Sequence, residues 1–269
     1  MGALEGKVAI VTGAGRLRGI GRATAVALAQ EGCDVVITGT GRDPSTFPED
    51  EKRIGWRDIE SVAEQIQALG RRALPLVVDV TDAQQVREMV HRTLQTFGRI
   101  DILVNNAAFA RGPDRVPVWE VDERVFRRVL EVKVVGAFLC TKYVAPVMQR
   151  QRWGRIVNVS SAAGKRGPPN TSAYAAANAA LHLFTQSVAR ELAPYGITVN
   201  AVCPGVTDTS RMDDLGRGER WEALLQTIPL GRAATDEEVG RFIAFLCSPV
   251  CDYITGQAIN FNGGSVMEH

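Results

Sequence analysis

The chain of 269 residues has almost no net charge: 31 Lys and Arg against 30 Asp and Glu leave +1 at pH 7. Proteins whose main partner is nucleic acid usually carry a surplus of positive charge, so we expect no nucleic-acid partner. The sequence contains no run of 18 apolar residues, and its first residues lack the charged-then-apolar order of a signal peptide. We therefore expect no membrane partner and a cytoplasmic location.

Cysteine and histidine are also scarce. The five cysteines are an odd number without the spacing of a disulfide framework, which favours reduced thiols. Cys247 and Cys251 lie four residues apart with no histidine near them, and His91, His182 and His269 are scattered along the chain. We therefore predict no metal site.

The rest of the composition, 45% hydrophobic and 23% charged, is that of a globular domain. Short apolar stretches alternate with longer stretches of helical pattern, which predicts a parallel sheet with crossover helices. We expect strands at 8–11, 35–38, 76–80, 102–105, 155–160, 198–202 and 258–261, and helices at 22–31, 58–69, 84–97, 121–150, 172–193 and 236–246. Because the strands are continuously apolar, the sheet should be covered on both faces. The prediction is an α/β fold in one domain, 1–269: a Rossmann-type doubly wound parallel sheet with a polar loop insertion at about 39–57.

A glycine-rich turn, Thr12 to Gly21, lies between the first expected strand and the first expected helix. Glycines there permit a tight turn and close approach of a pyrophosphate, and the helix N-terminus supplies free N–H donors. The position after the first strand indicates dinucleotide binding more strongly than the glycines alone. The alternative is a glycine-rich turn without a ligand.

The choice of cofactor is usually made just after the second strand, where an acid would hold the ribose 2′-hydroxyl of NAD. Gly39 occupies that place, and no acid follows it directly. Arg16, Arg18 and Arg42 could instead bind the 2′-phosphate of NADP. The sequence thus favours NADP, with NAD possible, unless these arginines are solvated loop charges.

These motifs and several others resemble the short-chain dehydrogenase/reductase family over residues 7–264. The glycine-rich turn matches the family pattern with two additional residues, and Ser161, which lies 13 residues before Tyr174, matches the catalytic serine. Further matching segments are Asp79-Val80, Asn105-Asn106-Ala107-Ala108, Pro204-Gly205-Val206-Thr207-Asp208-Thr209, Ile254-Thr255-Gly256-Gln257 and Asn262-Gly263-Gly264. The resemblance implies cofactor contacts from Gly13, Arg16, Arg18, Gly19, Ile20, Gly21, Arg42, Asp79, Val80, Asn105, Ala107, Pro204, Gly205, Val206 and Thr209.

The resemblance also implies hydride transfer between a nicotinamide cofactor and a carbonyl or secondary alcohol. Tyr174 would act as general acid or base, and Ser161 would hold the substrate oxygen. A free phenol has a pKa near 10, so a nearby cation must stabilise the phenolate. The family uses a Lys one helical turn after the Tyr, but this chain has Asn178 there.

A second departure from the family is reciprocal to the first. The family has a catalytic Asn in the preceding long helix, whereas this chain has Lys133 there. We hypothesise that Lys133 supplies the missing cation from the opposite helix and that Asn178 takes the amide role. The alternative is that Lys133 points to solvent and Asn178 is a loss. The protein would then be an impaired family member that binds cofactor or serves as a partner subunit, or an enzyme of the same fold with a non-redox reaction.

The resemblance places three variable segments, 109–119, 164–173 and 209–229, around a small-molecule substrate. Arg111 or Arg115 could clamp a carboxylate or phosphate, or these charges could be solvated. Gly216 and Gly218 suggest that residues of about 207–229 form a mobile lid. The resemblance further implies a homotetramer or homodimer packed through the helices that contain Lys133 and Tyr174.

Overall fold

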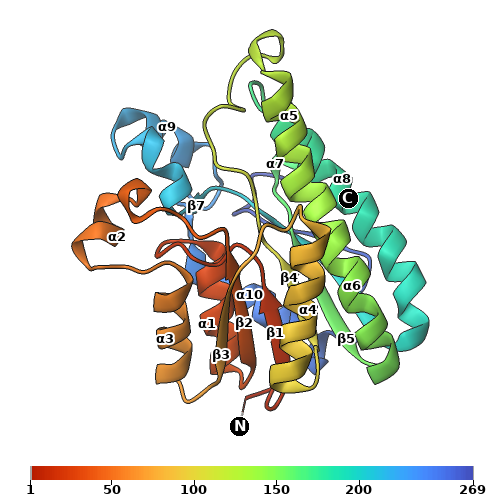
Figure 1. Cartoon of the computed structure of the whole chain (residues 1–269). Coiled ribbons are helices and arrows are strands. Elements are labelled where there is room, and N and C mark those ends of the chain that lie inside the picture. The colour runs from red at the N-terminus through yellow and green to blue at the C-terminus, as the bar shows by residue number, and fades with distance from the viewer. Residues whose placement is uncertain (1, 269) are drawn as a thin grey trace.

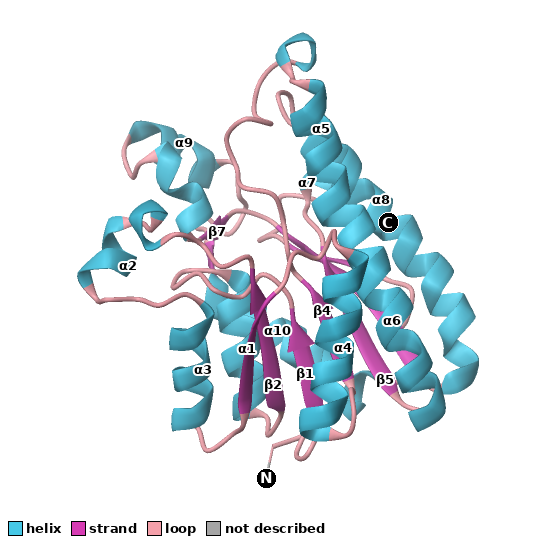
Figure 2. Cartoon of the chain, viewed as in Figure 1, coloured by secondary structure: helices cyan, strands magenta, loops and turns pink. Residues whose placement is uncertain are grey.

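The structure is a computed structural model that describes residues 2–268. A seven-stranded parallel sheet lies between two layers of helices (Figures 1 and 2). Its strands are β1 (Val8–Val11), β2 (Asp34–Gly39), β3 (Ala73–Val77), β4 (Ile102–Asn105), β5 (Gly154–Val159), β6 (Ile197–Pro204) and β9 (Ala258–Phe261). Their order is β3-β2-β1-β4-β5-β6-β9, so β1 pairs with both β2 and β4. The strand order reverses beside β1, and ligands of such sheets bind at the carboxyl ends of the strands there.

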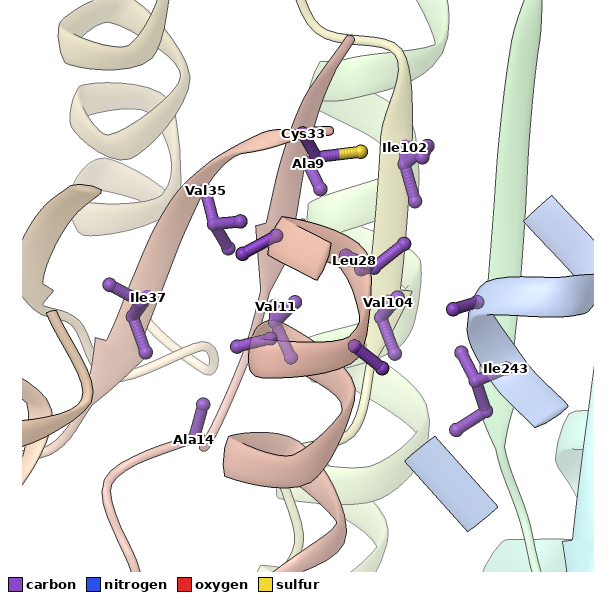
Figure 3. Packing of buried hydrophobic residues seen from close by; sticks show 14 of the residues in the cluster. Ala9, Val11, Ala14, Leu28, Cys33, Val35, Ile37, Ile102, Val104 and Ile243 are labelled. Atoms are coloured by element: carbon purple, nitrogen blue, oxygen red, sulfur yellow. The ribbon is translucent and has the colours of Figure 1, made fainter. Parts of the chain in front are cut away.

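Each face of the sheet is covered by three long helices. One layer contains α1 (Ile20–Gln30), α3 (Ile59–Ala68) and α10 (Asp236–Cys247), and the other contains α4 (Ala83–Phe97), α6 (Gly136–Gln151) and α8 (Ser172–Leu192). Figure 3 shows Leu28 of α1 and Ile243 of α10 packed against the apolar side chains of the strands. Burial on both faces confirms the predicted doubly wound α/β fold.

Shorter elements surround the carboxyl ends of the strands, where Figure 1 shows α2 and α9 above the sheet. They include α2 (Glu49–Arg53), α5 (Glu123–Leu130), α7 (Ala163–Arg166), α9 (Glu219–Gln226) and the two-stranded pair β7 (Thr207–Asp208) and β8 (Ala234–Thr235). Short 3₁₀ segments span Pro44–Thr46, Val118–Glu120, Ala193–Tyr195, Ser210–Leu215 and Pro249–Cys251. The segment 39–57, expected as a loop, therefore contains a helix. No helix within 2–268 is long and apolar enough to cross a bilayer.

Two expected elements differ from the structure. The third strand begins three residues earlier than predicted, because β3 is an edge strand that tolerates Pro75, while Val78 and Val80 leave the sheet. The long helix predicted over 121–150 is interrupted by a π-helical segment, Glu131–Val135, between α5 and α6. π-Helical turns within α-helices frequently occur at functional sites, and Lys133 lies in this one.

Candidate active site and cofactor crevice

A cavity of about 500 Å³ lies at the carboxyl ends of the central strands. Most of the residues that the sequence assigns to the site line it: Gly13, Arg16, Arg18, Gly19, Ile20, Gly21, Arg42, Asp79, Val80, Ala107, Lys133, Ser161, Tyr174, Pro204, Gly205 and Thr209. Asn105, Val206 and Asn178 do not line it. The cavity therefore joins the glycine-rich turn at one end to Ser161 and Tyr174 at the other.

The glycine-rich turn is fixed to the chain that follows β4. The Thr12 hydroxyl accepts hydrogen bonds from the backbone N–H groups of Asn106 and Ala107, at 3.0 and 3.1 Å. Gly13 has φ +66°, and a Cβ there would lie 2.8 Å from the Ala107 Cα, so this position requires glycine. No side chain caps the N-terminus of α1, which begins at Ile20. Its free N–H groups are suited to bind a pyrophosphate.

The Asn105 side chain does not line the cavity and instead takes part in a hydrogen-bond network within the sheet. Its side-chain amide donates to the Asn158 Oδ1 at 2.9 Å and to the Thr141 hydroxyl at 3.3 Å. Asn158 in turn donates to the Thr185 hydroxyl at 2.9 Å. The network joins β4 and β5 to α6 and α8 and holds the end of the sheet on which the site is built.

The two serines after β5 have different surroundings. The Ser160 hydroxyl donates to the Asn178 carbonyl oxygen at 3.0 Å and lies 2.8 Å from His182 Nε2, so α8 engages it. The Ser161 hydroxyl accepts only the Ala163 N–H within the described residues, at 3.1 Å. Ser161 therefore keeps the capacity to donate to a substrate oxygen.

Lys133 is buried, with 6% of its surface exposed, and lines the same cavity as Ser161 and Tyr174. Within residues 2–268 its ammonium has no hydrogen-bond or ion-pair partner. Burial, together with the nearby Arg211, lowers the pKa of Lys133 to about 7. The alternative in which this side chain points to solvent is wrong.

Asn178 is buried on α8 and does not face the cavity. Its amide donates to the Tyr174 carbonyl oxygen at 2.8 Å, one turn back along its own helix, and its Oδ1 has no partner. The structure therefore places one of the two exchanged residues at the site, and the other inside the helix packing.

Sequence reasoning missed the neighbour of Tyr174, because that residue comes from the loop before α5. The Arg115 guanidinium lies 4.0 Å from the centroid of the Tyr174 ring. The Arg115 side chain is 17% exposed, and burial lowers its pKa. It pairs with Asp114 at 3.5 Å, so the expectation of a solvated charge is wrong for Arg115.

The segment expected as a lid is tied to both walls of the cavity. The Arg211 guanidinium donates to the Phe109 carbonyl oxygen at 2.6 Å, and Arg111 forms an ion pair with Asp214. Arg18 pairs with Asp213. Arg111 is thus ion-paired with a residue of the expected lid, and its charge is not simply solvated.

Two of the arginines at the far end of the cavity, Arg42 and Arg18, are paired with carboxylates. Arg42 contacts Glu51 at 3.0 Å and Asp58 at 2.6 Å, and Arg18 also contacts Asp50 at 2.7 Å. All three carboxylates belong to the segment after β2. An acid does lie beside Gly39 in space, namely Asp58, although none follows Gly39 directly in the sequence.

The cavity joins a glycine-rich turn and an uncapped helix N-terminus to a serine and a tyrosine at the carboxyl ends of a doubly wound sheet, an arrangement suited to an oxidoreductase. A family model described as enoyl-(acyl carrier protein) reductase matches residues 13–266. The chain is 40% identical over 268 residues (99% of this chain, 100% of the relative) to a 3-oxoacyl-[acyl-carrier-protein] reductase of Synechocystis sp.. It is 39% identical over 264 residues (98% and 99%) to the 3-oxoacyl-[acyl-carrier-protein] reductase FabG of Thermotoga maritima.

A solved structure is similar to this chain over almost its whole length. A protein of Sinorhizobium meliloti named a "putative short-chain alcohol dehydrogenase" has a TM-score of 0.85 and 32% identity, with 97% of each chain covered. The chain belongs to the short-chain dehydrogenase/reductase family of oxidoreductases, as the sequence motifs predict.

Proposed function

We propose that this protein transfers a hydride between a nicotinamide dinucleotide and a carbonyl or secondary alcohol. The observation that carries the proposal is the shared cavity of Ser161, Tyr174 and the buried Lys133 beside the open N-terminus of α1. The names of the relatives support carbonyl reduction, and a 3-oxoacyl thioester is the first substrate to test.

The residues present fit such a cofactor. The N-terminus of α1 would hold the pyrophosphate, Asp79 and Val80 the adenine end, and Pro204, Gly205 and Thr209 the nicotinamide end. When bound, the nicotinamide supplies or accepts the hydride. Tyr174 donates a proton to the carbonyl oxygen, or accepts one from the alcohol, while the Ser161 hydroxyl holds the same oxygen.

Lys133 replaces the Lys that the family carries on the tyrosine helix. A phenol becomes an effective base near neutral pH only when a cation favours its phenolate. Arg115 is a cation beside the Tyr174 ring, and Lys133 adds a second one in the cavity while it is protonated; neither comes from α8. A pKa of about 7 lets Lys133 gain or lose a proton near neutral pH, which suits a proton relay.

The proposal is tested with purified protein, NADH and NADPH, and a panel of 3-oxoacyl thioesters and other carbonyl compounds. We expect cofactor absorbance to fall with the wild type and turnover to drop about 100-fold or more in Lys133→Asn. Adding Asn178→Lys to Lys133→Asn should partly restore turnover. Lys142→Asn, an exposed position on α6, is the matched control and should stay fully active.

Full activity of Lys133→Asn would reject the role of Lys133. A wild type that binds cofactor but turns over none of the panel would favour a binding or non-redox role. One observation favours that second candidate. Asn178 carries no charge and bonds back to its own helix, so Tyr174 has no neighbouring cation on α8 at that position.

The expected homotetramer or homodimer stays a prediction, as does the cytoplasmic location. Apolar side chains are exposed on the two helices expected to pair, with Phe138 at 44% and Leu183 at 70% exposure. Such residues are suited to an interface between copies of the chain. Light scattering on the purified protein measures the assembly.

A further inference from the structure

A carboxylate from the segment after β2 lies beside the glycine-rich turn. Asp58 precedes α3 and lines the cavity, and its side chain is nine-tenths buried, with 10% exposed. A Cβ on Gly15 would overlap the Asp58 Oδ1, and a Cβ on Gly39 would lie 3.1 Å from the Asp58 Oδ2. The carboxylate thus lies between the turn and the end of β2, where dinucleotide folds bind the adenosine ribose.

The two oxygens of this carboxylate have different partners. Oδ1 accepts hydrogen bonds from Arg42 Nε at 2.9 Å and from Arg42 Nη2 at 2.6 Å. Oδ2 is buried and has no hydrogen-bond partner among residues 2–268. A buried carboxylate oxygen left unpaired is costly, so a donor from a ligand is expected there.

The backbone of Asp58 shows that this orientation is imposed. Its φ is +52°, which is uncommon outside glycine, and its side chain does not cap α3, although Asp is a favoured N-cap residue. Trp56, two residues earlier, donates from its indole N–H to the Gly15 carbonyl oxygen at 2.6 Å. The connection to α3 is therefore fixed to the turn and directs the carboxylate into the crevice.

The local charge balance opposes a second phosphate. Arg42 is neutralised by Asp58 and by Glu51, which is fully buried and also accepts the Leu17 N–H at 2.9 Å. Arg18 is paired with Asp50 and Asp213. Within the described residues, Arg16 donates a side-chain hydrogen bond only to the Ser210 hydroxyl, at 3.5 Å, and has no carboxylate in an ion pair, so it favours an anion at this end.

We infer that Asp58 makes this protein select NAD over NADP: its carboxylate accepts hydrogen bonds from the adenosine ribose hydroxyls and repels a 2′-phosphate. Asp58 thereby performs, from a position 19 residues further along the chain, the task of the acid that is missing at Gly39. The inference rests on the proposed function, because it requires that the crevice bind a nicotinamide dinucleotide.

The test is the dissociation constant of NAD and of NADP, each measured by isothermal titration calorimetry on the purified full chain. We expect the wild type to bind NAD at least about tenfold more tightly than NADP, as a charge-assisted hydrogen bond provides. Asp58→Asn keeps the shape and tolerates a positive φ. The variant should bind NAD about tenfold more weakly and NADP more tightly than the wild type does. The two dissociation constants should then lie within about threefold of each other.

Asp43→Asn is the matched control, since Asp43 is exposed on the same segment outside the cavity. The ratio of its NAD and NADP dissociation constants should equal that of the wild type. Preferential binding of NADP by the wild type overturns the inference while leaving the proposed function intact. An unchanged ratio in a folded Asp58→Asn also overturns it. Should the variant not fold, the wild-type ratio still decides. Absence of binding by either dinucleotide would overturn both the inference and the proposed function.

Discussion

Replacing Lys133 by methionine removes a buried ammonium, so we expect a protein that is more stable but inactive. Methionine keeps the length and the apolar stem of lysine while removing its charge. The pKa of Lys133 is lowered from 10.5 to about 7, chiefly by burial. At 1.36 kcal/mol per pH unit, the charged form destabilises the folded state by about 5 kcal/mol at acid pH.

The direction in which stability changes with pH follows from how many protons the folded and unfolded chains bind. Between about pH 7 and 10.5, the unfolded chain keeps the Lys133 proton that the folded chain has lost, so wild-type stability from this group rises with pH. Lys133→Met has no such group. The stability advantage of Lys133→Met should therefore shrink by about 2–3 kcal/mol between pH 6 and pH 9.

The assay is urea unfolding of the cofactor-free protein at pH 6 and pH 9, at one fixed protein concentration because of the expected assembly. Lys142→Met, an exposed lysine on α6, is the control and should change stability by less than about 0.5 kcal/mol at either pH. If Lys133→Met is no more stable than the wild type and the two respond equally to pH, the argument for a buried, unpaired ammonium is wrong.

Two further predictions concern the neighbour of Tyr174 and the packing of α1 against α10. Arg115→Gln should lower turnover about tenfold, because the variant loses the cation that packs against the Tyr174 ring; turnover equal to that of the exposed control Arg124→Gln would refute this. Gly240→Ala should lower the free energy of unfolding by about 2 kcal/mol, since the new Cβ would lie 2.6 Å from the Ala23 carbonyl carbon and force α1 away from α10. Gly218→Ala, with no atom within 4 Å of the new Cβ, is its control in urea unfolding, and equal stability of the two variants would contradict the prediction.

Local sequence patterns predicted the architecture because each strand and helix carries its own periodicity and its own end signals. Continuous apolar strands require helices on both faces of the sheet. The turn after β1 needs a glycine at position 13, because the backbone there has φ +66°. The same local patterns failed where tertiary contacts decide. The helix expected over 121–150 is broken by the π-helical segment at Lys133, and Pro75 marks an edge strand that the apolar pattern placed three residues too late.

The sequence by itself determined the sheet and the glycine-rich turn, and its resemblance to the family pointed to Ser161 and Tyr174, because these features depend on residue type at short spacing. Only the tertiary structure decided which side chains meet at the crevice. Arg115 reaches Tyr174 from a segment 59 residues earlier, and Asp58 reaches Gly15 from 43 residues later. Such pairs form because elements pack against one another across the sheet, and no spacing along the chain records which loops that packing brings together.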